Sequence, residues 1–126
     1  MITIDYQNRM PIYEQIVERF QTLIVNGALE PDTQLPSVRN LAVDLAINPN
    51  TIQKAYAVLE QQGFIYPVKG RGNFVSGDSE VKNRKIQAFY RTLKNVVIQG
   101  KELGVTRDEF LEKSKEMFEE GQYDRN

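Results

Sequence analysis

Two neighbouring segments in the middle of the chain place apolar residues along one face of a helix. The apolar positions follow an i, i+3, i+4, i+7 spacing and are Val38, Leu41, Ala42 and Leu45 in the first segment and Ile52, Ala55, Tyr56 and Leu59 in the second. The segments are separated by Ala46 and Ile47, which is too little chain for an extended crossover. The pattern therefore predicts that residues 35–63 form two core-facing helices that cross steeply, as in a helix-turn-helix.

The residues at the ends of both segments are suited to begin and end helices. Ser37 is placed to cap the first helix, while Asn48 can cap the second and Pro49 suits its first position. Gly63 can end the second helix with a positive φ. Many such turns carry Gly where this chain has Ala46, and an Ala at positive φ costs on the order of 1 kcal/mol. We therefore expect a turn that is slightly distorted or that simply tolerates this cost.

The outward side of the second predicted helix is polar in its first turn. It carries three groups that can hydrogen-bond base edges or phosphates and one cation, namely Asn50, Thr51, Gln53 and Lys54. This composition indicates a helix that can enter a groove of DNA.

A basic hairpin is predicted directly after this helix. Residues 64–68 and 73–75 are expected to form two short β segments, joined by Lys69, Gly70, Arg71 and Gly72. Such a turn is weak evidence alone, because most are solvated loops. Together with the helix-turn-helix and one further helix predicted before it, however, the hairpin completes a winged-helix pattern. In that pattern the wing lies along the DNA backbone or in the minor groove, and its glycines let the main chain approach phosphates.

The segment before the motif predicts one further helix and an arm. An apolar stripe runs from Pro11 to Asn26, and Gly27 follows where a helix end favours positive φ. Residues 2–6 alternate between apolar and polar side chains, which indicates a short strand or an extended arm. Small polar residues at 76–79 predict a linker after the hairpin.

The C-terminal segment, residues 80–126, predicts two amphipathic helices. The first spans about six turns, and Thr106 with Glu109 forms a capping box for the second. Two helices cannot bury all their apolar side chains by themselves. We favour a second subunit over the winged-helix body of the same chain as the partner. The residues expected at this dimer interface are Phe89, Tyr90, Leu93, Val96, Val97, Phe110, Met117 and Phe118.

The amino-acid composition excludes several kinds of catalytic and metal-binding site. The chain has no cysteine and no histidine, which excludes disulfides, thiolate or imidazole metal sites and an imidazole base. We therefore expect neither an enzyme nor a metal or cofactor protein. The N-terminus lacks a basic head with an apolar run, and no stretch approaches the length of a membrane span. A cytoplasmic protein is expected.

The net charge of the chain does not by itself indicate nucleic-acid binding. The whole chain carries −1, and residues 1–78 hold 6 basic and 8 acidic side chains. The cations Arg39, Lys54, Lys69 and Arg71 nevertheless all fall in the helix-turn-helix and the hairpin. DNA binding is thus expected to depend on a local patch rather than a general field.

These residues resemble the GntR family of bacterial transcription regulators. The match lies in PIYEQIVERFQTLIVNGAL, LPSVRNLA, INPNTIQKAYAVLEQQGFI and KGRGNFV, and it covers roughly residues 9–75. The NPNTIQKAY form and the short tail are most similar to the YtrA subfamily. The expected fold is mainly α with a small β-hairpin: a winged helix-turn-helix in residues 1–75, a linker in 76–79 and a helical dimerisation segment in 80–126.

The resemblance also implies which residues contact DNA. They are Arg39, Asn50, Thr51, Gln53 and Lys54, with Lys69, Gly70, Arg71 and Gly72 in the wing. Each has a simpler interpretation: Arg39 and Lys54 as solvated charges, and Asn50 and Thr51 as helix caps. Several relatives have arginine where this chain has Pro49 and Gln53, so their base preference is not transferred.

The resemblance to the YtrA subfamily further implies dimerisation through the tail and repression of a nearby operon, often one encoding an ABC-type transporter. Our leading hypothesis is a homodimeric repressor whose two recognition helices bind an inverted-repeat operator in double-stranded DNA. Many members of the GntR family have a large C-terminal domain that binds a metabolite or resembles an aminotransferase. With 47 residues after Ser79 and no histidine, we expect neither a metal-assisted effector pocket nor a cofactor-binding lysine. Whether a small-molecule effector exists stays open. The alternative is a protein-interaction module, with the winged helix as scaffold and the apolar tail binding another protein.

Overall fold

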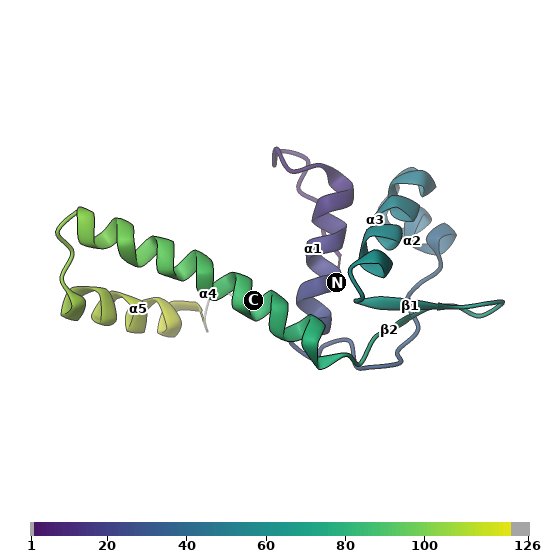
Figure 1. The fold of residues 1–126 in the computed structure, drawn as a ribbon. Coiled ribbons are helices and arrows are strands. Elements are labelled where there is room, and N and C mark those ends of the chain that lie inside the picture. Colours follow the sequence, from purple (N-terminus) through teal and green to yellow (C-terminus); the bar gives the residue numbers. More distant parts are fainter. Residues whose placement is uncertain (1, 122–126) are drawn as a thin grey trace. The chain divides into compact units, whose positions relative to one another are not determined.

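The computed structural model describes residues 2–121, which form five helices and one hairpin. In chain order the elements are α1 (Ile12–Val25), α2 (Val38–Leu45), α3 (Pro49–Gln61), β1 (Ile65–Val68), β2 (Gly72–Val75), α4 (Ser79–Glu102) and α5 (Arg107–Gly121) (Figure 1). They make two compact units, which we call the winged-helix unit (through Lys85) and the C-terminal unit (from Ile86). The predicted fold class, mainly α with a small hairpin, is confirmed.

The core of the winged-helix unit lies where α1 meets α3. Both helices bury the apolar stripes seen in the sequence, and the fully buried members are Ile16, Phe20, Ile24, Ile52, Ala55 and Leu59. The rings of Phe20 and Tyr56 meet edge to face with centroids 5.8 Å apart. The Tyr56 hydroxyl donates a hydrogen bond of 2.7 Å to the Pro36 carbonyl, which satisfies it inside the core. The interpretation of Tyr56 as a core residue is confirmed.

The turn between α2 and α3 holds Ala46 in the left-handed region, at φ 53° and ψ 47°. The Ile47 amide donates to the Ala42 carbonyl and the Ala46 amide to the Val43 carbonyl, the bonding pattern of a Schellman helix end. Ser37 and Asn48 cap the two helices as predicted, by accepting from the amides of Asn40 and Asn50. The turn therefore tolerates the cost at Ala46 without distortion.

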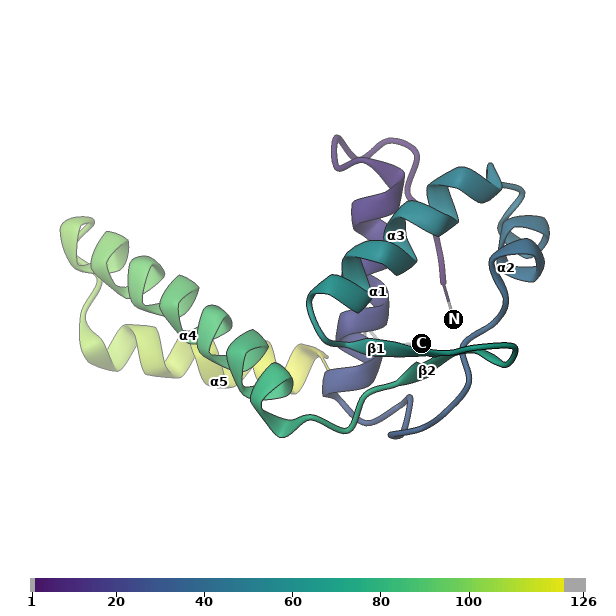
Figure 2. The same ribbon diagram turned by 45° about the vertical axis from the view of Figure 1, so that its right-hand side comes forward.

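The hairpin is confirmed, with strand ends one residue from the prediction. β1 and β2 are antiparallel, with Tyr66 opposite Phe74. The loop before α2 runs along the outer edge of β2: the Leu35 amide donates to the Asn73 carbonyl, and the Val75 amide donates to the Thr33 carbonyl. From this support the hairpin projects out of the unit (Figure 2).

The N-terminal residues form an arm and not a strand, which corrects one of the two expectations for residues 2–6. Ile2 and Ile4 pack against the core. The Gln15 side chain holds the arm, because its amide oxygen accepts from the Asp5 amide and its nitrogen donates to the carbonyls of Asp5 and Met10.

The first turns of α4 are part of the winged-helix unit. Val81 is 4% exposed and belongs to the core, and a Cβ at Gly63 would lie 3.2 Å from its side chain. The Lys85 ammonium donates to the buried Gln21 amide oxygen, and the Gln21 amide nitrogen donates to the Gln62 side-chain oxygen. Helix α4 begins inside the predicted linker 76–79. The division at 75 and 80 stays a prediction, and a winged-helix fragment should extend through Lys85.

In the C-terminal unit, α5 runs back along α4 (Figures 1 and 2). The capping box is confirmed: the Thr106 hydroxyl accepts from the Glu109 amide, and the Glu109 carboxylate accepts from the Thr106 amide and hydroxyl. Across residues 2–121, no helix combines the length and the apolar content that a membrane span requires.

The backbone conformation of Ala46 leads us to expect that replacing two different alanines by glycine changes the free energy of unfolding in opposite directions. Ala46→Gly should raise the free energy of unfolding by about 1 kcal/mol, because glycine adopts positive φ without steric cost. Ala57→Gly, at an exposed position inside α3, should lower it by about 1 kcal/mol. Urea unfolding of both variants measures the difference, and equal destabilisation by both would contradict the strain assigned to Ala46.

Candidate nucleic-acid interface

Burial of one face of α3 determines which of its residues face outward. Ile52, Ala55 and Leu59 are fully buried. A helix turns by about 100° per residue, so this stripe leaves Asn50, Gln53 and Lys54 exposed, with Thr51 half-buried. The exposed group occupies the first two turns of α3, where the sequence predicted a DNA-contacting surface.

Three of the four polar side chains of this surface take no part in hydrogen bonds or ring contacts among the described residues. Within residues 2–121, the side chains of Asn50, Thr51 and Gln53 make no hydrogen bond, since Asn48 supplies the helix cap. Interpreting Asn50 and Thr51 as caps is therefore wrong. Arg39 lies in the first turn of α2, is exposed, and takes part in no ion pair among the described residues.

Lys54 differs from its neighbours because it has a partner. Its ammonium nitrogen lies 4.0 Å from the centroid of the Tyr13 ring in the first turn of α1, a cation–π geometry. The sequence gives no signal for this contact, because Tyr13 lies 41 residues before Lys54 and periodicity does not pair residues of different helices.

The four residues of the wing tip, Lys69, Gly70, Arg71 and Gly72, are all exposed. Gly70 and Gly72 have φ of 78° and 107°, which favours glycine at both positions. The Arg71 amide donates to the Val68 carbonyl and closes the turn. Both cationic side chains are free of hydrogen bonds and ion pairs within the part of the chain that the structure describes.

Two side-chain contacts that the sequence did not reveal attach the wing to the loop before α2. The Gln34 side chain donates a 2.6 Å hydrogen bond to the Arg71 carbonyl. The Tyr66 hydroxyl donates to the Asp32 carboxylate, and the Tyr66 ring stacks on Phe74. This hydrogen bond is the main cause that raises the pKa of Tyr66. The wing tip therefore has a defined position relative to the start of α2.

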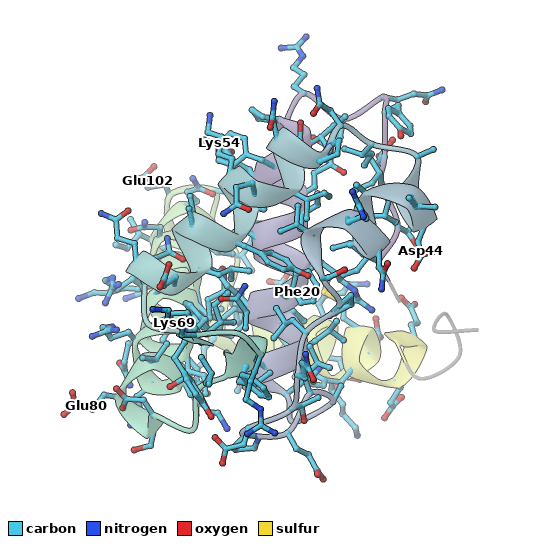
Figure 3. All side chains as sticks on the ribbon, turned by 90° about the vertical axis from the view of Figure 1, so that its right-hand side faces the viewer. Phe20, Asp44, Lys54, Lys69, Glu80 and Glu102 are labelled. Carbon is cyan, nitrogen blue, oxygen red and sulfur yellow. The ribbon has the colours of Figure 1, made fainter. Side chains whose placement is uncertain are left out.

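The charge of the winged-helix unit is balanced once its true extent is known. Continuing from residue 78 to Lys85 adds three cations and one acid, which makes nine basic and nine acidic residues. Figure 3 places Lys54 of α3 and Lys69 of the hairpin on the left of the view, where Glu80 of α4 also lies, and Asp44 of α2 on the right. The unit is therefore neutral overall, so its binding to DNA has to depend on individual cations in close contact and not on a general positive field.

The predicted dimerisation residues lie in the C-terminal unit and are mostly exposed. On α4, Phe89 and Tyr90 are more than half exposed, and on α5 Met117 is 64% and Phe118 81% exposed. Val97 and Phe110 are half-buried and line an apolar groove of about 250 Å³ together with Gly100, Val105 and Leu111. The apolar surface of the unit is thus not covered by packing of α4 against α5.

Comparison with known proteins supports this geometry. Residues 12–75 match the family model described as "Bacterial regulatory proteins, gntR family". The chain is 37% identical over 119 residues to the HTH-type transcriptional repressor YtrA of Bacillus subtilis, covering 93% of this chain and 92% of that protein. It also resembles the solved GntR family transcriptional regulator from Listeria monocytogenes, with a TM-score of 0.76 and 35% identity over 90% of this chain and 98% of the other.

A third similarity concerns a protein solved on DNA. The DNA-binding domain of AraR in complex with operator ORE1 has a TM-score of 0.51 and 30% identity, covering 60% of this chain and 93% of that domain. The match of the family model to residues 12–75 and the similarity along almost the whole of YtrA place the chain in a family of regulators and not of enzymes. The chain belongs to the gntR family of bacterial regulatory proteins and is a DNA-binding transcriptional regulator.

Proposed function

We propose that this regulator is a repressor that binds an inverted-repeat operator as a homodimer. The observation that carries the proposal is the exposed polar side of the first two turns of α3, where the side chains of Asn50 and Gln53 are free of hydrogen bonds among the described residues. In the proposed complex, each α3 enters a major groove, and the two half-sites lie about one DNA turn, roughly 34 Å, apart.

The contacts divide by chemistry. Arg39 and Gln53 are proposed to read base edges, because guanidinium and amide groups form bidentate pairs with guanine and adenine. Asn50 and Thr51 are proposed to bond bases or phosphates. Phosphate contacts are assigned to Lys54, Lys69 and Arg71, and Gly70 and Gly72 let the wing backbone approach the DNA.

The homodimer is proposed to form through the C-terminal unit. Phe118 is 81% exposed and Phe89 63% exposed, and large exposed apolar patches mark interaction sites. A twofold interface of these faces would bury the predicted residues of both copies. In this arrangement Val97 and Phe110 provide the groove, and exposed side chains such as Phe118 of the second copy fill it.

Repression and the target are proposed from similarity alone. YtrA of Bacillus subtilis is named a repressor. The resemblance to the YtrA subfamily supports an operon for an ABC-type transporter as the target and the cytoplasm as the location. Fluorescence anisotropy against the DNA upstream of the chain's own gene, at two salt concentrations with random DNA as competitor, tests the proposal. Binding equal to that of random DNA would mean another operator or another function.

Removing either base-reading side chain should weaken operator binding. We expect Arg39→Ala and Gln53→Ala each to cost about 1–3 kcal/mol, or roughly 5- to 100-fold in affinity, because a bidentate base contact is lost. The matched controls are Gln61→Ala, an exposed glutamine at the far end of α3, and Arg91→Ala on α4. Both controls should bind like the parent. Unchanged affinity in both test variants would refute the assignment of the interface.

Charged substitutions in the C-terminal unit should separate the subunits. Phe89→Glu and Phe118→Glu should shift the molar mass measured by light scattering from dimer to monomer, because each buries a carboxylate at the interface. Leu103→Glu is the control, since Leu103 is 82% exposed, like Phe118, but lies outside the predicted interface. A monomeric parent protein, or a dimer that persists in both test variants, would contradict this interface. The apolar surface would then be available to another protein.

A further inference from the structure

We propose that Tyr13 is a positioning residue for DNA binding, which holds the ammonium group of Lys54 in place for a phosphate. The inference rests on the proposed function, and it brings the first turn of α1 into the interface. Tyr13 is the second residue of α1, and Lys54 lies in the second turn of α3. The ammonium nitrogen is 4.0 Å from the ring centroid.

The core fixes the relative position of the two residues. Tyr13 precedes Ile16 by one turn on the same face of α1, and Lys54 directly precedes Ala55 on α3. Ile16 and Ala55 are fully buried in the same core. The ring is half-buried, and its hydroxyl donates a 3.1 Å hydrogen bond to the Glu14 carboxylate. The core therefore fixes the backbones of both residues, which keeps the Tyr13 ring within reach of the Lys54 ammonium group.

The ring remains a neutral phenol, as a cation–π contact of this kind requires. The hydrogen bond to Glu14, and then the negative charge of Glu14, raise the pKa of the Tyr13 hydroxyl above its usual value. The ring thus stays uncharged at neutral pH, and Lys54 is attracted by the ring face and not by a phenolate.

A lysine held in this way remains able to bind DNA. The ring attracts the ammonium group through its face, and the Lys54 N–H donors make no hydrogen bond within residues 2–121. A phosphate oxygen can accept from them while the contact persists. An unrestrained lysine loses much side-chain freedom when it is fixed at an interface. A lysine that Tyr13 already restricts loses less, so its phosphate contact is stronger.

The test is a double-mutant cycle in the full-length protein. Operator affinity is measured for Tyr13→Phe, Tyr13→Leu, Lys54→Met and the double variant Tyr13→Leu/Lys54→Met. We expect Tyr13→Phe to bind like the parent, because the aromatic face is kept. Tyr13→Leu should weaken binding about 2- to 5-fold. Lys54→Met should weaken it further and lower the slope of log affinity against log salt by about one.

The coupling energy between the two substitutions shows whether Tyr13 acts by positioning Lys54 or only by stabilising the fold. The double variant should bind no more weakly than Lys54→Met, because Tyr13 acts only through Lys54. Tyr6→Leu, which changes an exposed tyrosine in the N-terminal arm, is the matched control and should bind like the parent. Losses that add in the double variant, or parent-like affinity in Tyr13→Leu, would overturn the proposal.

A second measurement needs no substitution at Tyr13. The Lys54 ε-methylene protons lie near the ring face and should show an upfield ring-current shift in the NMR spectrum of the free protein. We expect the shift to persist in the operator complex. Its loss on adding operator would mean that Lys54 leaves the ring to bind DNA, and would overturn the proposal. Absence of specific operator binding by the parent protein is seen before any variant is made, and would overturn the proposed function together with this inference.

Discussion

The packing of α1 against α3 is the interaction on which the candidate interface depends. Burial of each large apolar side chain in this core contributes about 1.5–3 kcal/mol, and Ile52 and Leu59 commit α3 to one rotation about its axis. Asn50 and Gln53 face outward as a consequence, and their side chains make no hydrogen bond within the part of the chain that the structure describes. A polar residue in place of Ile52 would therefore damage both stability and DNA recognition, because the same burial produces both.

The wing depends on a different kind of interaction, made by polar side chains at the edge of a very small sheet. An isolated two-stranded hairpin is marginally stable. Here the loop before α2 supports β2 through backbone bonds, and the contacts of Tyr66 with Asp32 and of Gln34 with the Arg71 carbonyl hold its outer part. Because the same loop leads into α2, the wing tip and Arg39 are positioned by one segment of chain.

Local signals in the sequence were enough to predict the elements, and long-range contacts were not. The caps at Ser37, Asn48 and Thr106 marked helix starts, since capping depends on residues within one turn. The small polar residues at 76–79 gave no sign that Val81 would enter the core next to Gly63. The contact of Tyr13 with Lys54 was invisible for the same reason: periodicity gives the buried face of a helix, but not which residue of another helix it meets.

Because the winged-helix unit has a balanced charge, its binding to DNA is expected to depend on dimerisation through the C-terminal unit. With nine basic and nine acidic residues, one unit has no general field that draws it to DNA, and its cations act only through close contacts. The few cations of one winged-helix unit therefore support only weak binding to DNA. In the proposed dimer, the first bound half-site holds the second unit near its own half-site, so the two modest affinities combine through effective concentration. A neutral monomer would then scan DNA poorly, and occupancy of an operator would depend on the apolar surfaces of α4 and α5 as much as on α3.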